Sequence, residues 1–278
     1  MKHFTNSRFV LLVMVSLLQT GFLFGQSGKK SYTNYQNALK NPLSVKTLRL
    51  GFQGMKELPA SISQFENLEV LILNNNHLHT LPPEIGNLKS LRKLNVFSNK
   101  LDSLPREIGQ LRNLEKLIVS GNNLKWLPPE IGRLHFLKEL SAKNNMLESI
   151  PAEICGLPQL EELYLSINSL KALPPEIGQM EALKFLSLDQ NNLQELPPEI
   201  GDLPRIRFFI LGKNNLDRLP KEIGKLTTLH ELNLAHSGIL LEIPPEIGNL
   251  KHLDLLTIDV NTRLPYVRFG SQTKIVYQ

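Results

Sequence analysis

The residues of this chain that could act in catalysis or bind a metal are few and scattered. His77 and His79 lie two residues apart, and His230 and His236 fall within one later stretch. Neither pair has a Cys or a third His at the spacing of a zinc site. The chain has no Gly-x-Ser-x-Gly elbow and no His-Glu-x-x-His pair. We therefore predict no catalytic residue, no metal site and no cofactor, and a function other than an enzyme's.

Cysteine and glutamate, the other reactive residue types, have positions that favour structural roles. Cys155 is the single cysteine, so no intrachain disulfide can form, and it stands where most equivalent stretches have Gly. We expect a small buried residue there, and a reactive thiol or an intermolecular bridge is the alternative. A Glu recurs in the Pro-x-Glu-Ile-Gly stretches about once per 23 residues. That regular spacing is typical of a solvated edge and not of a pair of catalytic carboxylates.

The charge of the chain is nearly balanced. The 278 residues carry a formal charge of +5, but Lys2 and Arg8 lie in a segment that we expect to be removed. The remaining chain has 29 basic and 26 acidic residues, and Lys and Arg alternate with Glu along almost all of it. Because a nucleic-acid surface needs basic residues gathered on one face, we predict no nucleic-acid partner.

The N-terminus has the pattern of an export signal. Residues 1–8 include Lys2 and Arg8, and residues 9–24 are largely apolar. This stretch is too short and interrupted for a membrane-spanning helix, which favours a cleaved signal peptide. We place the cut after Gly25. No Cys that could carry a lipid stands near this bond, so we predict a protein without a lipid anchor and without stable membrane insertion, located outside the cell, on its surface or in a periplasm.

A period of 23 residues governs the rest of the sequence. A representative unit, residues 91–113, reads LRKLNVFSNKLDSLPREIGQLRN. Leu94 and Val96 alternate with outward positions, which predicts a short parallel strand. A turn follows the strand, and a short helical or 3-10 segment begins near the Pro. Ten repeats begin at Val45, Leu68, Leu91, Leu114, Leu137, Leu160, Leu183, Ile206, Leu229 and, after a one-residue insertion, Leu253.

An Asn recurs where each strand ends and the chain turns. Its amide can donate and accept hydrogen bonds for backbone groups that the bend leaves unpaired, and it can link neighbouring coils. We therefore predict a structural Asn ladder that is weakest near its ends, where Gln53 and Ser237 replace Asn. Its members are Asn76, Asn99, Asn122, Asn145, Asn168, Asn191 and Asn214, with Asn261 as a further equivalent.

The pattern L-x-x-L-x-L-x-x-N-x-L, followed by L-P-x-E-I-G-x-L, resembles the leucine-rich repeat over residues 45 to about 265. With the export signal and the stretch YTNYQNALKNPLSVKTLRL, the chain is similar to the secreted leucine-rich-repeat proteins of pathogenic spirochaetes. The resemblance implies an α/β fold: a curved solenoid with a concave parallel β-sheet and short helical or 3-10 segments on the convex side. It also implies an extracellular or surface location and adhesion to host proteins.

These patterns divide the chain into four parts. We expect a signal peptide over 1–25, an N-terminal cap over 26–44, a solenoid of about ten repeats over 45–265, and a C-terminal cap over 266–278. A short amphipathic helix over 32–41 would close the first coil, and residues 266–278 would fold over the last one. Caps are needed because each repeat buries its apolar side chains only against its neighbours.

The outward side chains of the strands form the surface on which a partner could bind. Ten strands make a ribbon about 45 Å long with a footprint near 700 Å², which is the scale of a protein partner. Many of its residues are apolar, and apolar and aromatic residues at the centre of a face often anchor interfaces. Scattered surface hydrophobics without function are the alternative. The candidate protein-binding residues are Val70, Ile72, Lys93, Phe97, Lys116, Ile118, Tyr164, Ile167, Phe185, Phe208 and Ile210.

Charge on this face is basic toward the N-terminal half and acidic toward the C-terminal half, which would steer a partner into one orientation unless the distribution is chance. We predict a secreted, non-enzymatic protein-binding module, such as an adhesin that engages a host surface or matrix protein. A periplasmic or envelope scaffold, or a self-associating protein, is the alternative. A regulator of intracellular signalling is a third class, which the export signal disfavours.

Overall fold

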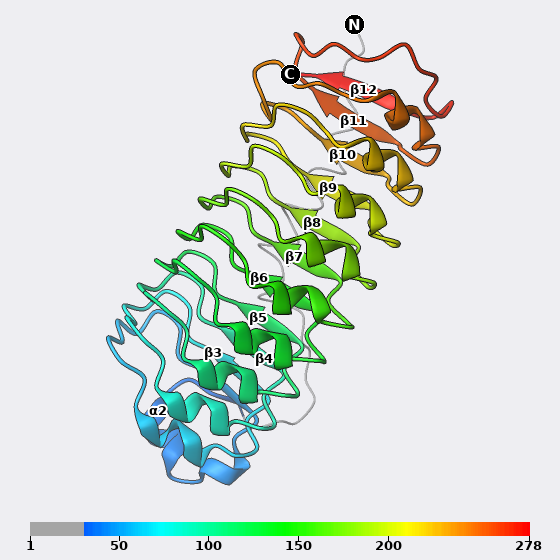
Figure 1. The fold of residues 1–278 in the computed structure, drawn as a ribbon. Helices are drawn as coiled ribbons and strands as arrows, with labels where there is room; N and C mark the ends of the chain where they lie inside the picture. The colour runs from blue at the N-terminus through cyan, green and yellow to red at the C-terminus, as the bar shows by residue number, and fades with distance from the viewer. Residues whose placement is uncertain (1–30) are drawn as a thin grey trace, which may run out of the picture. The chain divides into compact units, whose positions relative to one another are not determined.

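The computed structural model describes residues 31–278, and the predicted signal peptide lies outside the described residues. Residues 31–278 contain one sheet of twelve parallel strands, and each strand pairs with the next one in the sequence (Figure 1). The strands are β1 (Ser31–Tyr32), β2 (Thr47–Arg49), β3 (Val70–Ile72), β4 (Lys93–Asn95), β5 (Lys116–Ile118), β6 (Glu139–Ser141), β7 (Glu162–Tyr164), β8 (Phe185–Ser187), β9 (Phe208–Ile210), β10 (Glu231–Asn233), β11 (Leu255–Ile258) and β12 (Lys274–Tyr277).

The register of the sheet follows the 23-residue period. Lys93 pairs with Lys116, and Leu94 pairs with Leu117, so equivalent residues stand side by side on neighbouring strands. Leu94 and Leu117 are fully buried, whereas Lys93 is only partly covered. The alternation of inward and outward residues therefore produces one apolar column and two outward columns. This arrangement confirms the expected curved solenoid.

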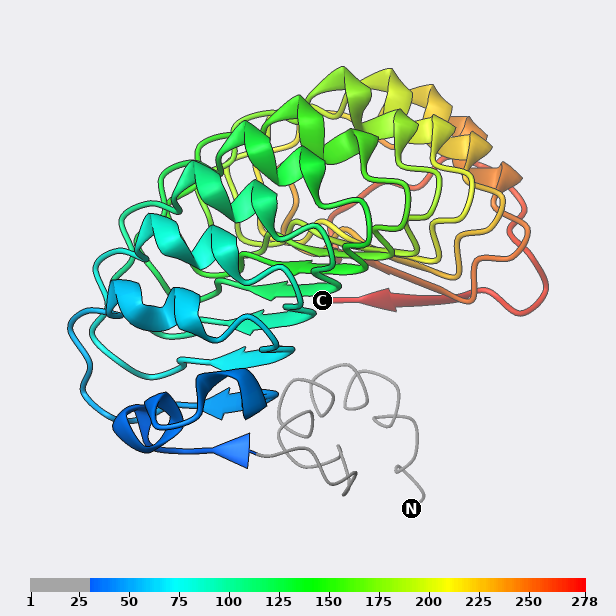
Figure 2. The same cartoon turned by 90° about the horizontal axis from the view of Figure 1, so that it is seen from below.

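Short 3-10 helices form the opposite layer, on the convex side of the arc (Figure 2). They are η1 (Pro42–Ser44), η2 (Ala60–Gln64), η3 (Pro83–Asn87), η4 (Arg106–Gln110), η5 (Pro129–Arg133), η6 (Ala152–Gly156), η7 (Pro175–Gln179), η8 (Pro198–Asp202), η9 (Lys221–Lys225) and η10 (Pro245–Asn249). The coils approach so closely here that a side chain at Gly109 would collide with the carbonyl oxygen of Glu130 in the next coil. Cys155 stands in this glycine column and is fully buried.

The Asn residues join each coil to its neighbours. Asn122 donates through Nδ2 to the carbonyl oxygens of Val119, at 2.8 Å in its own coil, and Val96, at 3.1 Å in the preceding coil. Its Oδ1 accepts the backbone N–H of Leu101 at 3.0 Å. The same three kinds of bond recur at Asn76, Asn99, Asn145, Asn168, Asn191 and Asn214.

The ladder changes at its ends. Ser237 is fully buried and keeps only the bond to the preceding coil, from its hydroxyl to the carbonyl oxygen of Leu211 at 3.0 Å. The amide of Gln53 instead donates to the carbonyl oxygen of Thr33. Asn261 is exposed, so the expectation that it is a further equivalent is wrong. Its coil is followed by β12, which does not repeat the turn.

Both ends of the described chain add a strand that the repeat pattern does not contain. Ser31–Tyr32 pairs with β2, and Lys274–Tyr277 pairs with β11, so the sheet has two strands more than the ten repeats. The helix expected over 32–41 is shorter, since α2 spans Tyr35–Leu39 after an N-cap at Asn34. No helix within residues 31–278 has the length and apolar character needed to cross a membrane.

Candidate functional site

The concave face is built from two outward columns of strand residues. The first column contains the first residue of each repeat strand, namely Thr47, Val70, Lys93, Lys116, Glu139, Glu162, Phe185, Phe208, Glu231 and Leu255. The second column contains the third residue of each strand, namely Arg49, Ile72, Asn95, Ile118, Ser141, Tyr164, Ser187, Ile210, Asn233 and Thr257. Neither column repeats one residue type, so the solenoid fold does not require a particular side chain at these positions.

Three of the predicted residues form an aromatic cluster on β7, β8 and β9. The ring centroids of Tyr164 and Phe185 are 4.8 Å apart, and those of Phe185 and Phe208 are 6.1 Å apart. Both ring pairs are tilted by less than 40°, and pairs at these distances are attractive beyond the area they bury. Ile210 follows Phe208 on the same face of β9. The cluster is thus a partly exposed apolar surface on neighbouring strands.

Most of the other predicted apolar residues lie apart from this aromatic cluster. Val70 and Ile72 are outward residues of β3, and Ile118 is on β5. Phe97 follows β4 and is 43% exposed. Ile167 lies in the turn after β7, three residues beyond Tyr164, and is partly exposed. The predicted apolar residues are therefore one aromatic cluster, with Ile167 in the turn after its first strand, and a separate group in the N-terminal half.

The turns after β2 to β10 each hold a residue in the left-handed backbone region at the same place in the repeat. Asn75, Ser98, Asn144 and Gly121 take positive φ values between 54° and 67° in this column, at the same 23-residue spacing. Ile167 takes φ 55° in the same column. A β-branched side chain is strongly disfavoured there, since its Cβ approaches the following carbonyl oxygen. Ile167 therefore carries backbone strain that Asn144, one coil earlier, avoids.

The charges of the first column are only partly paired. Lys116 forms an ion pair with Glu139 on the next strand, so the middle of the face is internally compensated. Lys93 is half-buried, and burial, followed by the nearby charge of Lys116, holds the pKa of its ammonium below the usual value. Glu162 accepts the hydroxyl of Tyr164 at 2.8 Å.

Glu231 is the acidic residue of the first column that lacks such a partner. It lies between Phe208 on β9 and Leu255 on β11, both apolar. This burial raises the pKa of the Glu231 carboxyl, because desolvation disfavours its charged form. No residue among 31–278 forms a hydrogen bond or ion pair with its carboxylate. A half-buried carboxylate thus stands beside an aromatic ring with its hydrogen-bonding capacity unused by the described protein.

A small polar network lies beside the aromatic cluster. The Ser187 hydroxyl donates to the Asp189 carboxylate at 2.9 Å, and the Ser166 hydroxyl is bonded to both. The two serines are buried. Because these groups satisfy one another, the network fixes the second column next to Phe185.

Sequence reasoning missed two features that lie off the concave columns. One is a row of ion pairs along the flank of the sheet, which includes Lys46 with Glu69 at 3.2 Å and Lys184 with Glu161 at 2.9 Å. Partners in this row are 23 residues apart, so the repeat spacing contains the signal. It indicates a structural row that joins neighbouring coils.

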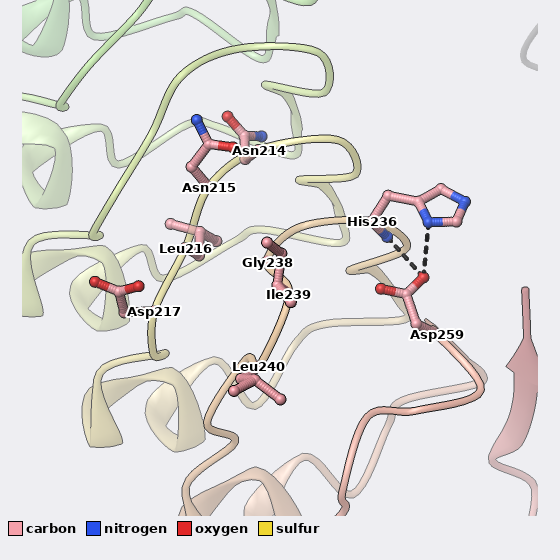
Figure 3. Close-up of a pocket in the computed structure, with 9 residues that line it drawn as sticks. All are labelled: Asn214, Asn215, Leu216, Asp217, His236, Gly238, Ile239, Leu240 and Asp259. Carbon is pink, nitrogen blue, oxygen red and sulfur yellow. Dashed lines mark hydrogen bonds and ion pairs between the residues drawn. The ribbon is translucent and has the colours of Figure 1, made fainter.

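The other missed feature is an open hollow of about 630 Å³ beside the one-residue insertion (Figure 3). Ile239 and Leu240 on its rim are 97% and 86% exposed. His236 donates its backbone N–H to Asp259 at 2.8 Å, and its ring Nδ1 lies 3.1 Å from the same carboxylate (Figure 3). These two apolar side chains stand at the insertion, which makes the ninth repeat one residue longer than the others.

The histidines and the cysteine do not form a metal centre among the described residues. Nδ1 of His79 lies 3.7 Å from the carboxylate of Asp102, and His230 pairs with Asp254 at 2.8 Å. Within residues 31–278, no three His, Cys, Asp or Glu side chains are grouped closely enough to hold a metal ion. Burial raises the pKa of Cys155 to about 12, so its thiol stays protonated.

Three sequence-family comparisons match the repeats. A model described as a leucine-rich repeat region matches residues 83–167 and 198–275, and two further leucine-rich-repeat models match residues 158–216 and 67–88. No curated protein matches the sequence.

Solved structures give the same result. A leucine-rich-repeat protein of Leptospira interrogans is 37% identical, with a TM-score of 0.60, over 88% of this chain and 77% of that one. The ectodomain of the Arabidopsis thaliana receptor kinase GASSHO1/SCHENGEN3, solved in complex with Casparian strip integrity factor 2, is 27% identical with a TM-score of 0.65, over 84% of this chain and 31% of that one. InlJ from Listeria monocytogenes shares the fold at 22% identity and a TM-score of 0.68, over 84% and 47% of the two chains.

Proposed function

Since the chain belongs to the leucine-rich-repeat family, we propose that it is a secreted, non-enzymatic module that binds a protein through its concave face, with adhesion to a host protein as its role. The observation that carries this proposal is the aromatic cluster of Tyr164, Phe185 and Phe208. Aromatic side chains that a solenoid leaves on its sheet cannot contribute to the core, and they are the residue types that anchor interfaces.

The dimensions and charges of the face support a macromolecular partner. Twelve strands spaced about 4.8 Å apart give a ribbon roughly 50 Å long. The unpaired Lys93 near one end and Glu231 near the other would orient a partner of opposite pattern. The plant receptor ectodomain that is similar to this chain was solved in complex with Casparian strip integrity factor 2. That complex is a precedent for ligand binding by this kind of solenoid.

The test of the binding face is a pull-down from soluble host matrix and serum proteins. Tyr164, Phe185 and Phe208 are changed together to Ser, and the matched control changes Trp126 and Phe136, which are 56% and 49% exposed and lie outside the two columns. We expect a specific partner to be lost with the first variant and kept with the second. A partner that ignores the aromatic cluster but requires Trp126 and Phe136 would contradict the proposal.

The location is tested separately. Protease added to intact cells should degrade an exposed adhesin, with a cytoplasmic protein as the control for lysis. Protection from protease until the outer envelope is opened would favour an envelope scaffold over adhesion. The two experiments are independent, because a scaffold could also use the concave face.

A further inference from the structure

The first column of the concave face contains two phenylalanines between two carboxylates. The register runs Glu162, Phe185, Phe208, Glu231 and Leu255 on five consecutive strands. The two carboxylates differ, because Glu162 accepts a hydrogen bond from Tyr164, whereas nothing among residues 31–278 binds Glu231.

A half-buried carboxylate without a partner is costly in a folded protein. The fold does not require it, since the equivalent residues of other repeats include Thr47, Val70 and Leu255. Its oxygens stay accessible, because no fully buried side-chain nitrogen or oxygen in the described chain lacks a hydrogen bond. Glu231 therefore presents a negative charge to whatever covers the concave face.

The ring of Phe208 beside Glu231 indicates which kind of partner group would bind there. A cation is attracted both to the face of an aromatic ring and to a carboxylate. The guanidinium of arginine can do both at once, because it is planar, stacks on rings and donates two parallel hydrogen bonds to one carboxylate. Phe208 and Glu231 stand directly opposite each other on adjacent strands, within the reach of one such side chain.

We propose that the partner protein inserts an arginine side chain between Phe208 and Glu231, while an apolar neighbour of that arginine covers Phe185 and Tyr164. This assignment rests on the proposed function and names the chemistry of its partner. The charge complementarity is specific to one end of the cluster, because Glu162 and Glu139 are already engaged by Tyr164 and Lys116.

The experiment uses a displayed library of random twelve-residue peptides, selected on the purified protein. Three variants are compared with the unchanged protein: Glu231→Gln, the Phe185→Ser and Phe208→Ser double variant, and Glu246→Gln. Glu246 lies in η10, on the convex side of the same repeat, and has the same charge, so its variant is the matched control. The strongest peptide is then synthesised with its arginine or with citrulline, which has the same shape without the charge.

We expect enriched peptides to contain arginine next to an apolar residue. Glu231→Gln and the citrulline peptide should each weaken binding about tenfold or more, as for truncation of one partner of a close charge pair, and their combination should weaken it little further. The Glu246→Gln variant should bind like the unchanged protein.

Two other outcomes separate this inference from the proposed function. Peptides that depend on Phe185 and Phe208 but ignore Glu231 would overturn the arginine assignment and leave the concave binding face intact. Peptides that depend on neither the aromatic cluster nor Glu231, or a failure to enrich any peptide, would count against both.

Discussion

The turn residue Ile167 gives the clearest stability prediction. Its φ of 55° costs a β-branched residue about 1–2 kcal/mol. Asn adopts the same conformation at Asn144 and Asn75, so Ile167→Asn should remove most of this strain while losing the contacts of a partly exposed side chain. We expect the free energy of unfolding to rise by about 0.5–1 kcal/mol, since the strain relief exceeds the apolar burial that is lost.

Such a change should raise the melting temperature by about 1–4 °C for a domain of this size. Differential scanning calorimetry of the unchanged protein and of Ile167→Asn measures it. The matched control is Asn144→Ile, which places the strained residue one coil earlier and should lower the melting temperature by a similar amount. If Ile167→Asn is no more stable and Asn144→Ile is no less stable, the turn does not carry the strain and the reasoning fails.

Three further predictions concern buried polar and ionisable groups. Asn122→Ala removes the three ladder bonds to Leu101, Val96 and Val119, together with a longer bond to Ser120. It should destabilise the protein by about 3 kcal/mol, measured by urea denaturation; a loss below about 1 kcal/mol would mean that the ladder is dispensable. The raised pKa of Glu231 means that the folded protein favours the protonated carboxyl. The stability that this protonated form contributes is fully present below the ordinary pKa of 4.5 and is lost as the pH rises through the folded pKa. Glu231→Gln should therefore be more stable than the unchanged protein at pH 7 and equally stable at pH 3, as measured by thermal melts at both pH values. Cys155, with its pKa raised to about 12 by burial, should resist alkylation at pH 8 in the folded protein and react once urea unfolds it, as read by mass spectrometry; rapid native labelling would show an accessible thiol.

The solenoid could be predicted because its geometry repeats at the same interval as its sequence. Leu94 and Leu117 stand side by side in the sheet, so one repeat predicts the packing of the next. The bonds of Asn122 follow in the same way, since they join groups at fixed offsets. The added strands at Ser31–Tyr32 and Lys274–Tyr277 lie outside the period, and no periodic pattern could reveal them.

The site was less predictable because its properties depend on which residues stand beside one another on adjacent strands. Lys116 was recognised as a charged outward residue, but only the register of β5 and β6 shows that it forms an ion pair with Glu139. The spacing of 23 residues could have indicated this pairing. The desolvation of Glu231 needed the structure, since it arises from Phe208 and Leu255 on either side.

Ile167 and Glu231 share one physical feature: each costs the fold stability, through backbone strain at one and desolvation at the other. Both lie near the aromatic cluster. The cost is avoided at the equivalent turn residues Asn75, Gly121 and Asn144, and at the equivalent strand residues Val70 and Leu255. A double variant, Ile167→Asn with Glu231→Gln, should therefore melt at a higher temperature than the unchanged protein at pH 7 and bind the selected arginine peptide more weakly. If these two residues instead stabilised the fold, their replacement would lower the melting temperature. A double variant that loses stability while keeping its affinity would thus refute the view that these two residues serve binding at the expense of the fold.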